Sequence, residues 1–133
     1  NILPIIPLDG SKILNLLLEK IFPYKLSNIL ILIISIVTLI LLLIFNIYSN
    51  NYNFIMIISI LIYYMFNFYK NLKYMFNRFL LERYLYNIEF KRKIIINNPN
   101  KMYKNRTHII KNNKKYQKER DFLNNLFDLN KNL

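Results

Sequence analysis

The chain has 133 residues, of which 54% are hydrophobic, and it carries 19 Lys and Arg against 7 Asp and Glu. It contains no cysteine, which excludes a disulfide framework and a metal site built from thiolates. Residues 26–69 contain no charged side chain, whereas most of the basic residues follow them. This separation predicts a membrane-embedded part followed by a basic cytoplasmic tail.

The opening stretch, NILPIIPLDG, leads to Asp9 and to the only glycine of the chain, Gly10. Pro4 and Pro7 forbid a regular helix through residues 1–7, because each lacks a backbone donor and holds the preceding residue extended. We therefore expect an extended apolar segment before Asp9. Asp9 has two interpretations at this point: a cap for the helix that follows, or an intramembrane carboxylate with a functional partner.

An amphipathic helix is predicted for residues 11–22. Its polar side chains fall within about a third of a helical wheel, and apolar side chains cover much of the rest. The polar set is Ser11, Lys12, Asn15 and Glu19, and the apolar set is Ile13, Leu14, Leu17, Leu18 and Ile21. Pro23 ends this helix, because its ring clashes with the preceding turn.

Two membrane crossings fit into the uncharged stretch, since its 44 residues are about twice the length that one helical span requires. We place the first from about Leu26 to Tyr48 and the second from about Phe54 to Tyr69, joined by a polar turn at residues 49–53. Basic residues flank the pair while the turn carries no charge. Both ends are therefore expected on the cytoplasmic side of a multi-pass cell-membrane protein.

After the second crossing the pattern stays helical through residues 71–85 and then changes. The stretches FKRKIII and THIIKNNKKYQ predict short strands, with a turn at Asn112 and Asn113, and ERDFLNNLFDL predicts a last amphipathic helix. Together they suggest a small αββα-like appendage. The single histidine, His108, is predicted to be a surface or packing residue of a strand, because one imidazole without neighbours cannot make a metal site.

The positive charge of the tail predicts contact with membrane lipids. Each Lys or Arg near an anionic leaflet gains about 1 kcal/mol. Basic residues interleaved with tyrosines are also typical of nucleic-acid surfaces. Because the charge lies just inside the predicted membrane, we favour lipid over a docked protein, and both over nucleic acid.

The opening residues resemble the second signature of the site-2 protease family, in which an asparagine and a proline precede Leu-Asp-Gly, a Ser or Gly, a basic residue and an apolar pair. The matching positions are Asn1, Pro4, Leu8, Asp9, Gly10, Ser11, Lys12, Ile13 and Leu14. Within the family, the chain is most similar to the small bacterial type that includes the sporulation-factor-processing enzymes.

The resemblance implies an intramembrane zinc metalloprotease whose active site opens toward the cytoplasm. In that family two histidines of an HExxH helix and the aspartate hold the zinc, so Asp9 would be the third ligand. Three protein ligands leave a position for water, and zinc lowers the pKa of that water to about 7. The resemblance also implies that Asn1 and Pro4 help hold a membrane-anchored protein substrate as an extended strand.

The chain departs from the family because it contains no HExxH motif. We therefore expect the C-terminal portion of such an enzyme, inactive alone, with a missing N-terminal half that supplies the histidines and the glutamate base. The expected fold is an all-α integral membrane part, with the motif segment and amphipathic helix at 1–25 and a two-span helical hairpin at 26–69, followed by a small basic α+β tail at 70–133. The alternative is a non-enzymatic two-span membrane protein whose basic tail recruits a partner, lipid or nucleic acid, with Asp9 as a helix cap.

Overall fold

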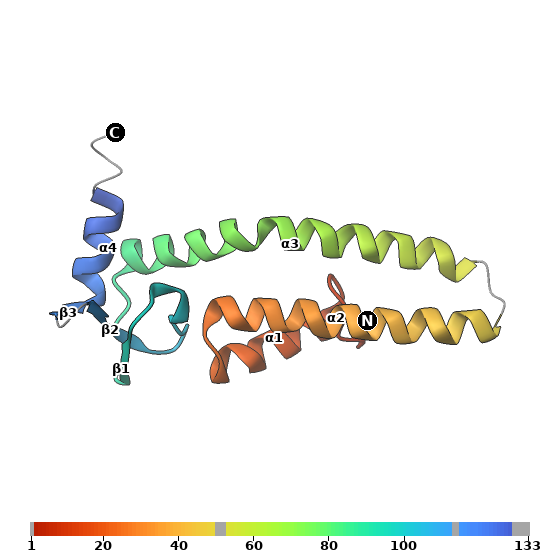
Figure 1. Cartoon of the computed structure of the whole chain (residues 1–133), viewed down its shortest axis with the longest axis horizontal. Coiled ribbons are helices and arrows are strands. Elements are labelled where there is room, and N and C mark those ends of the chain that lie inside the picture. The colour runs from red at the N-terminus through yellow and green to blue at the C-terminus, as the bar shows by residue number, and fades with distance from the viewer. Residues whose placement is uncertain (1, 50–52, 113–114, 129–133) are drawn as a thin grey trace.

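The computed structural model describes residues 2–49, 53–112 and 115–128. Over these ranges the chain is mostly helical, with four α-helices, one short 3-10 helix and a three-stranded sheet near the C-terminus (Figure 1). Asn1, the middle of the predicted turn at residues 50–52, and Asn113 lie outside the described residues.

Two long helices lie side by side and antiparallel, in agreement with the predicted hairpin (Figure 1). Helix α2 spans Tyr24–Ser49 and helix α3 spans Asn53–Tyr86. Both are long and apolar enough to cross a membrane. Only 22% and 11% of the residues in their most apolar stretches are buried, whereas the core helix of a soluble protein is mostly buried. Most of the apolar surface of the hairpin therefore faces outward.

Helix α3 continues without a break past residue 69, where the second crossing was predicted to end. Residues 70–86 extend the helix by about 25 Å along its axis. They carry Phe76, Phe79 and Leu80 into the hydrophobic core of the tail. One helix therefore joins the hairpin to the tail.

The tail contains strands β1 (Lys93–Ile96), β2 (Thr107–Asn112) and β3 (Lys115–Lys118), which lie in that order in one sheet. β1 pairs parallel with β2, and β3 returns antiparallel. Helix α4 (Glu119–Asp128) follows β3 directly. The predicted strands and last helix are confirmed, but the order of elements is αβββα, because the stretch from Thr107 folds into two strands.

The connection from β1 to β2 fastens the tail to the hairpin. It contains the 3-10 helix η1 (Pro99–Lys101) and reaches the start of α2. The backbone N–H of Tyr24 donates to the carbonyl oxygen of Met102 at 2.9 Å. The ring of Tyr24 stacks on Phe79, with ring centroids 4.4 Å apart. The beginning of α2 is thus part of the tail core.

Helix α1 (Asp9–Ile21) lies along the first half of α2 (Figure 1). It is amphipathic as predicted, but its polar side faces inward. Ser11 and Glu19 are 4% and 6% exposed, whereas Ile13 and Ile21 are 63% and 65% exposed. This is the reverse of the arrangement expected for an amphipathic helix that covers a core in water.

Polar partners account for the inward direction of these side chains. The side-chain amide of Asn15 donates to the Asn28 oxygen on α2 at 3.3 Å. The ammonium of Lys104, from the β1–β2 connection, bonds to the Glu19 carboxylate at 2.7 Å. Because buried polar groups are costly unless they are bonded, these contacts fix the inner face of α1.

The assignment of the tail core can be tested by shortening one of its buried side chains. Leu123 of α4 is 3% exposed and packs in the core cluster. We expect Leu123→Ala to lower the free energy of unfolding of the tail by about 2–5 kcal/mol, because it removes buried surface and leaves a cavity. Leu126→Ala, on the same helix, should change it by about 0.5 kcal/mol or less. Hydrogen exchange of the β2 amides measures both effects, and equal protection in the two variants would contradict the core assignment.

Candidate functional site

Asp9 is the first residue of α1 and not its cap, so the capping interpretation is wrong. The N-cap is Leu8, whose backbone is extended (φ −65°, ψ 157°), and no side chain bonds the first backbone amides of the helix. The Asp9 carboxylate instead accepts a hydrogen bond from the Lys12 ammonium, with Oδ1 and Nζ 2.9 Å apart. The two side chains are 67% and 70% exposed. An exposed pair of this kind is weak, so the carboxylate is accessible to another ligand.

Asp9 shares the outward face of α1 with apolar side chains. Ile13 and Leu16 follow it at i+4 and i+7 and are 63% and 58% exposed. Residues at this spacing lie on one side of a helix. The carboxylate therefore stands at the end of an exposed apolar stripe.

Gly10 allows the preceding segment to cross the start of α1. A Cβ atom at Gly10 would overlap the carbonyl oxygen of Ile2 and would lie 2.6 Å from the carbonyl oxygen of Leu3. Both contacts are with backbone, which cannot move aside as the end of a side chain can. The glycine of the Leu-Asp-Gly motif is therefore required by this close approach.

Ser35 of α2 fixes the same segment from the other side. Its hydroxyl accepts a hydrogen bond from the Ile6 N–H at 3.2 Å and lies 3.1 Å from the Pro4 carbonyl oxygen. Ile5 is fully buried against Leu39 and neighbouring residues of α2 and α3. The segment is bent and not extended as expected: residues 3, 4 and 8 lie in bends, and residues 6–7 form a turn in which the Leu8 N–H donates to the Ile5 carbonyl oxygen at 2.7 Å. The two prolines keep it out of a regular helix, and the Ser35 hydroxyl holds it in place.

Of the two residues expected to hold substrate, the structure describes Pro4 but not Asn1. Pro4 belongs to this bent segment, where its carbonyl oxygen faces the Ser35 hydroxyl. Asn1 lies outside the described residues. Within residues 2–49, 53–112 and 115–128, no group of three His, Cys, Asp or Glu side chains is arranged to hold a metal ion. In this part of the chain, Asp9 offers one carboxylate ligand and no complete zinc site.

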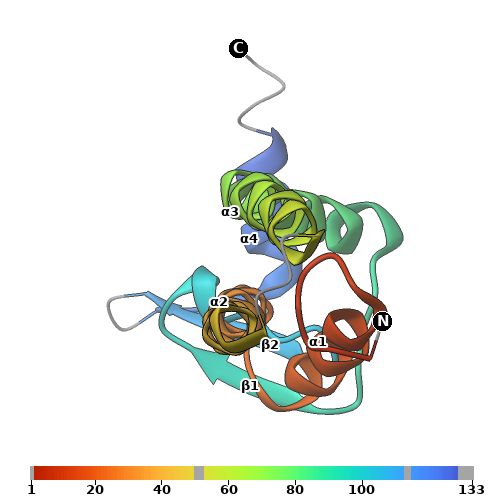
Figure 2. The ribbon, with the colours of Figure 1, turned by 90° about the vertical axis from the view of Figure 1, so that its right-hand side faces the viewer.

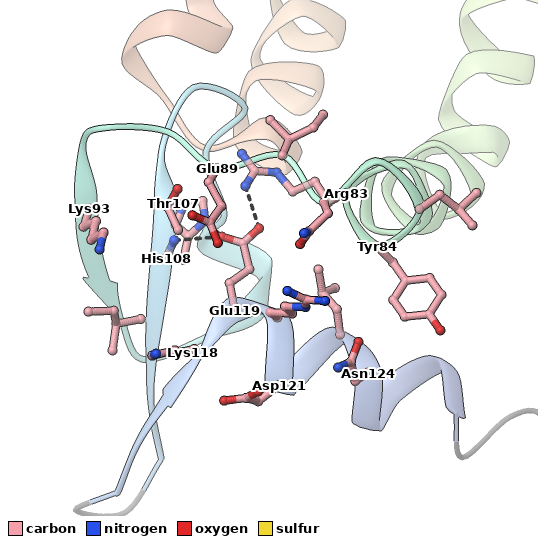
Figure 3. Close-up of a pocket in the computed structure, with 16 residues that line it drawn as sticks. Arg83, Tyr84, Glu89, Lys93, Thr107, His108, Lys118, Glu119, Asp121 and Asn124 are labelled. Carbon is pink, nitrogen blue, oxygen red and sulfur yellow. Dashed lines mark hydrogen bonds and ion pairs between the residues drawn. The ribbon is translucent and has the colours of Figure 1, made fainter.

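A buried ionic network in the tail was not predicted from the sequence (Figure 3). The Glu119 carboxylate bonds to the Arg83 guanidinium at 2.5 Å and to the His108 backbone N–H at 2.7 Å. Its Oε2 atom also lies 2.9 Å from His108 Nδ1. All three residues are nearly or fully buried. Only a partial signal was present in the sequence: Arg83 stands among apolar residues of α3, whereas Glu119 lies in the charged run from Lys118 to Asp121 and is not distinguished from its neighbours.

His108 acts as a structural link in this network. It lies in β2, as predicted, but its side chain is fully buried. Its Nε2 atom accepts a hydrogen bond from the Tyr103 N–H at 2.8 Å, so the ring proton is on Nδ1 and points at Glu119. With both ring nitrogens engaged, the imidazole is not available as a base for a substrate.

Arg83 joins α3 to the loop before β2. Its Nη2 atom donates to the carbonyl oxygens of Tyr103, Lys104 and Arg106 at 2.7, 3.0 and 2.9 Å. A cavity of about 830 Å³ opens beside the network. Its lining carries both signs of charge, including Lys93, Lys118, Glu89 and Asp121 (Figure 3). The mixed charges do not favour one class of ligand.

No protein-family model and no curated protein matches this chain. The Leu-Asp-Gly segment and the geometry around it are therefore what indicates a function for this chain.

The close approach at Gly10 is open to a direct test. Gly10→Ala should destabilise the N-terminal segment by about 1–3 kcal/mol, because the methyl group overlaps the backbone of residues 2–3. Leu17→Ala, at an exposed position on the same helix, is the control. Limited proteolysis of the segment in detergent micelles compares the two variants. Equal cleavage rates in Gly10→Ala and wild-type protein would contradict the crossing.

The buried network predicts a pH dependence. Burial raises the pKa of Glu119, but the hydrogen bond from His108 and the charge of Arg83 outweigh it, so the pKa lies below its ordinary value of 4.5. A carboxyl whose pKa is lowered by folding stabilises the fold above its unfolded pKa. That contribution is lost as the pH falls from about 4.5 through the lower folded pKa.

Substitution of Glu119 should remove this dependence. We expect Glu119→Gln to lower the stability of the tail at pH 7 by about 3–5 kcal/mol, because Arg83 is left buried without its partner. The difference from wild type should shrink as the pH falls below about 4.5. Asp121→Asn, in the exposed first turn of α4, should keep the wild-type profile. Thermal unfolding between pH 7 and pH 3 measures all three proteins, and a constant difference across that range would refute the assignment.

Proposed function

We propose that this chain is the C-terminal portion of a site-2-type intramembrane zinc metalloprotease, which hydrolyses peptide bonds of membrane-anchored substrates. Asp9 serves as the third zinc ligand. The observation that carries the proposal is the position of Asp9, exposed at the end of a non-helical segment that is pinned to a helix long enough to cross a membrane.

The depth of the segment supports an intramembrane site. Ser35 lies nine residues after Leu26, where the first crossing is predicted to begin, which is about 14 Å along the helix axis. This is about half of the roughly 30 Å of hydrocarbon in a bilayer. Non-helical backbone at that depth occurs only where it is buried in protein or lines a cavity. The bonds to Ser35 and the burial of Ile5 meet this condition.

The outward direction of Asp9 supports a metal site whose other ligands come from another part of the protein. The chain has a single histidine, His108, and both of its ring nitrogens are hydrogen-bonded within the tail. The two histidine ligands therefore have to come from outside the 133 residues. A helix that packs on the exposed stripe of Ile13 and Leu16 meets the Asp9 carboxylate at its end. When bound by three protein ligands, zinc supplies a water of pKa about 7. The described residues contribute the carboxylate and its rigid support.

The basic tail suits the cytoplasmic side of a cell membrane. Lys12, Lys20 and Lys25 precede the hairpin, and Lys70 and Lys73 follow the second predicted crossing. The positive-inside bias then places both ends in the cytoplasm, in a multi-pass protein. Membrane lipids are the proposed contact of the exposed lysines, at about 1 kcal/mol each near an anionic surface.

The assignment of Asp9 is tested in the complete protein that carries the HExxH part. Asp9→Asn should lower zinc content and reduce cleavage by more than about 100-fold, because loss of a direct ligand costs more than loss of an outer partner. Lys12→Gln is the control, since it removes the ion-pair partner and keeps the carboxylate. Zinc content by mass spectrometry and cleavage in vesicles are the two measurements.

Three outcomes separate the proposal from its alternative. Lost zinc and lost cleavage in Asp9→Asn, with both retained in Lys12→Gln, support the ligand. Unchanged cleavage in Asp9→Asn refutes it. A coding sequence without an upstream HExxH helix leaves the alternative, a non-enzymatic two-span membrane protein whose basic tail recruits a partner, lipid or nucleic acid.

A further inference from the structure

A shallow groove lies between the bent N-terminal segment and α3. Its volume is about 390 Å³, and it is lined by Ile6, Pro7, Tyr64, Asn67, Phe68, Asn71, Tyr74 and Met75. Figure 2, which looks along the helices, shows the N-terminal segment in red bending between α1 and α3. Because Pro7 stands two residues before Asp9, their α carbons are at most about 7 Å apart. The groove therefore adjoins the proposed zinc ligand.

Two asparagines of α3 line this groove without partners. Asn67 and Asn71 are both exposed. Among the residues that the structure describes, neither side chain has a hydrogen-bond partner. Each amide group has two N–H donors and a carbonyl acceptor. Asn67 lies within the second predicted crossing, where an unpaired amide is costly, and Asn71 lies just past its end. A peptide backbone in the groove can pair with both amides at this edge of the membrane.

The spacing of the two amides matches an extended peptide. Residues four apart on a helix are separated by about 6 Å along the axis. Alternate residues of an extended strand are about 6.6 Å apart. A strand that lies along α3 therefore brings every second peptide unit to an asparagine. Each amide can donate to a peptide carbonyl oxygen and accept from a peptide N–H.

The other walls of the groove suit apolar side chains. Tyr64, Phe68 and Met75 present aromatic and thioether surfaces, and none of the eight described lining residues is charged. A stretch of an apolar membrane segment has side chains that fit such walls. Once unwound, it also has backbone groups that find no partners in lipid. The side-chain amides of Asn67 and Asn71 can form hydrogen bonds with these backbone N–H and C=O groups.

We propose that Asn67 and Asn71 bind the backbone of an extended, apolar stretch of the substrate, close to the bond that is cleaved. Tyr64, Phe68 and Met75 accept its side chains. This inference rests on the proposed function and adds the residues of α3 that bind the substrate backbone. Asn67 and Asn71 are positioning residues and take no part in breaking the bond.

The variants Asn67→Leu and Asn71→Leu remove the amides and keep a side chain of similar size. They are made in the complete protein, in lipid vesicles, with a membrane-anchored substrate. Each should lower kcat/KM about tenfold, as expected for one or two lost hydrogen bonds, while zinc content stays at the wild-type level. Asn77→Leu, exposed on the same helix outside the groove, should behave as wild type.

A substrate with single backbone amides replaced by esters tests the contact without changing the protein. With wild-type protein, esters should slow cleavage at two positions that are two residues apart. At each of these positions, the ester should slow cleavage less in the Asn→Leu variant that lacks the bonded asparagine. The substrate N–H and that asparagine would then be partners in one hydrogen bond. Equal tolerance of esters at every position overturns the inference.

The remaining outcomes distinguish the inference from the function on which it rests. If Asn67→Leu and Asn71→Leu cleave as well as Asn77→Leu, water solvates the amides and the inference is overturned, while the proposed protease stands. If wild-type protein holds no zinc and cleaves nothing, both are overturned.

Discussion

The arrangement around Asp9 depends on one close approach, between the backbone of residues 2–3 and the bare α carbon of Gly10. Any side chain at this position would occupy the space through which the chain passes. From the opposite side, the Ser35 hydroxyl bonds to the Ile6 N–H and faces the Pro4 carbonyl oxygen. The segment is therefore held between α1 and α2, and this fixes where Asp9 enters its helix. For the proposed zinc ligand, this is the support that a metal site requires from residues that do not touch the metal.

The tail and the motif segment form one connected structure. Lys104 bonds to the buried Glu19 of α1, and Tyr24 contributes both its ring and its backbone N–H to the tail core. The loop that makes these contacts is in turn held by Arg83 through three carbonyl oxygens. Contacts from the tail thus reach the end of α1 opposite to Asp9. The basic tail is part of the framework that positions the motif.

Periodicity and composition were sufficient to predict the two long helices, the strand-forming stretches and α4, but not that α3 continues unbroken to Tyr86 or that residues 3–8 are bent. They failed where a side chain's role depends on a distant partner. The inward polar face of α1 follows from Asn28 and Lys104, which lie 13 and 85 residues away from their partners. The role of His108 follows from Glu119 and Tyr103, and a single-residue reading of an isolated histidine cannot reveal it. Asp9 begins its helix because the chain folds back over Gly10, which no local capping rule anticipates.

The unbroken course of α3 has a mechanical consequence. The same helix forms one wall of the groove at Tyr64–Met75 and, from the next residue on, enters the tail core with Phe76 and Phe79. A continuous helix transmits torsion, since its backbone hydrogen bonds keep neighbouring turns in register. A rotation of the tail about the axis of α3 would therefore turn Asn67 and Asn71 about the same axis. Movement of the tail is in this way coupled to the groove.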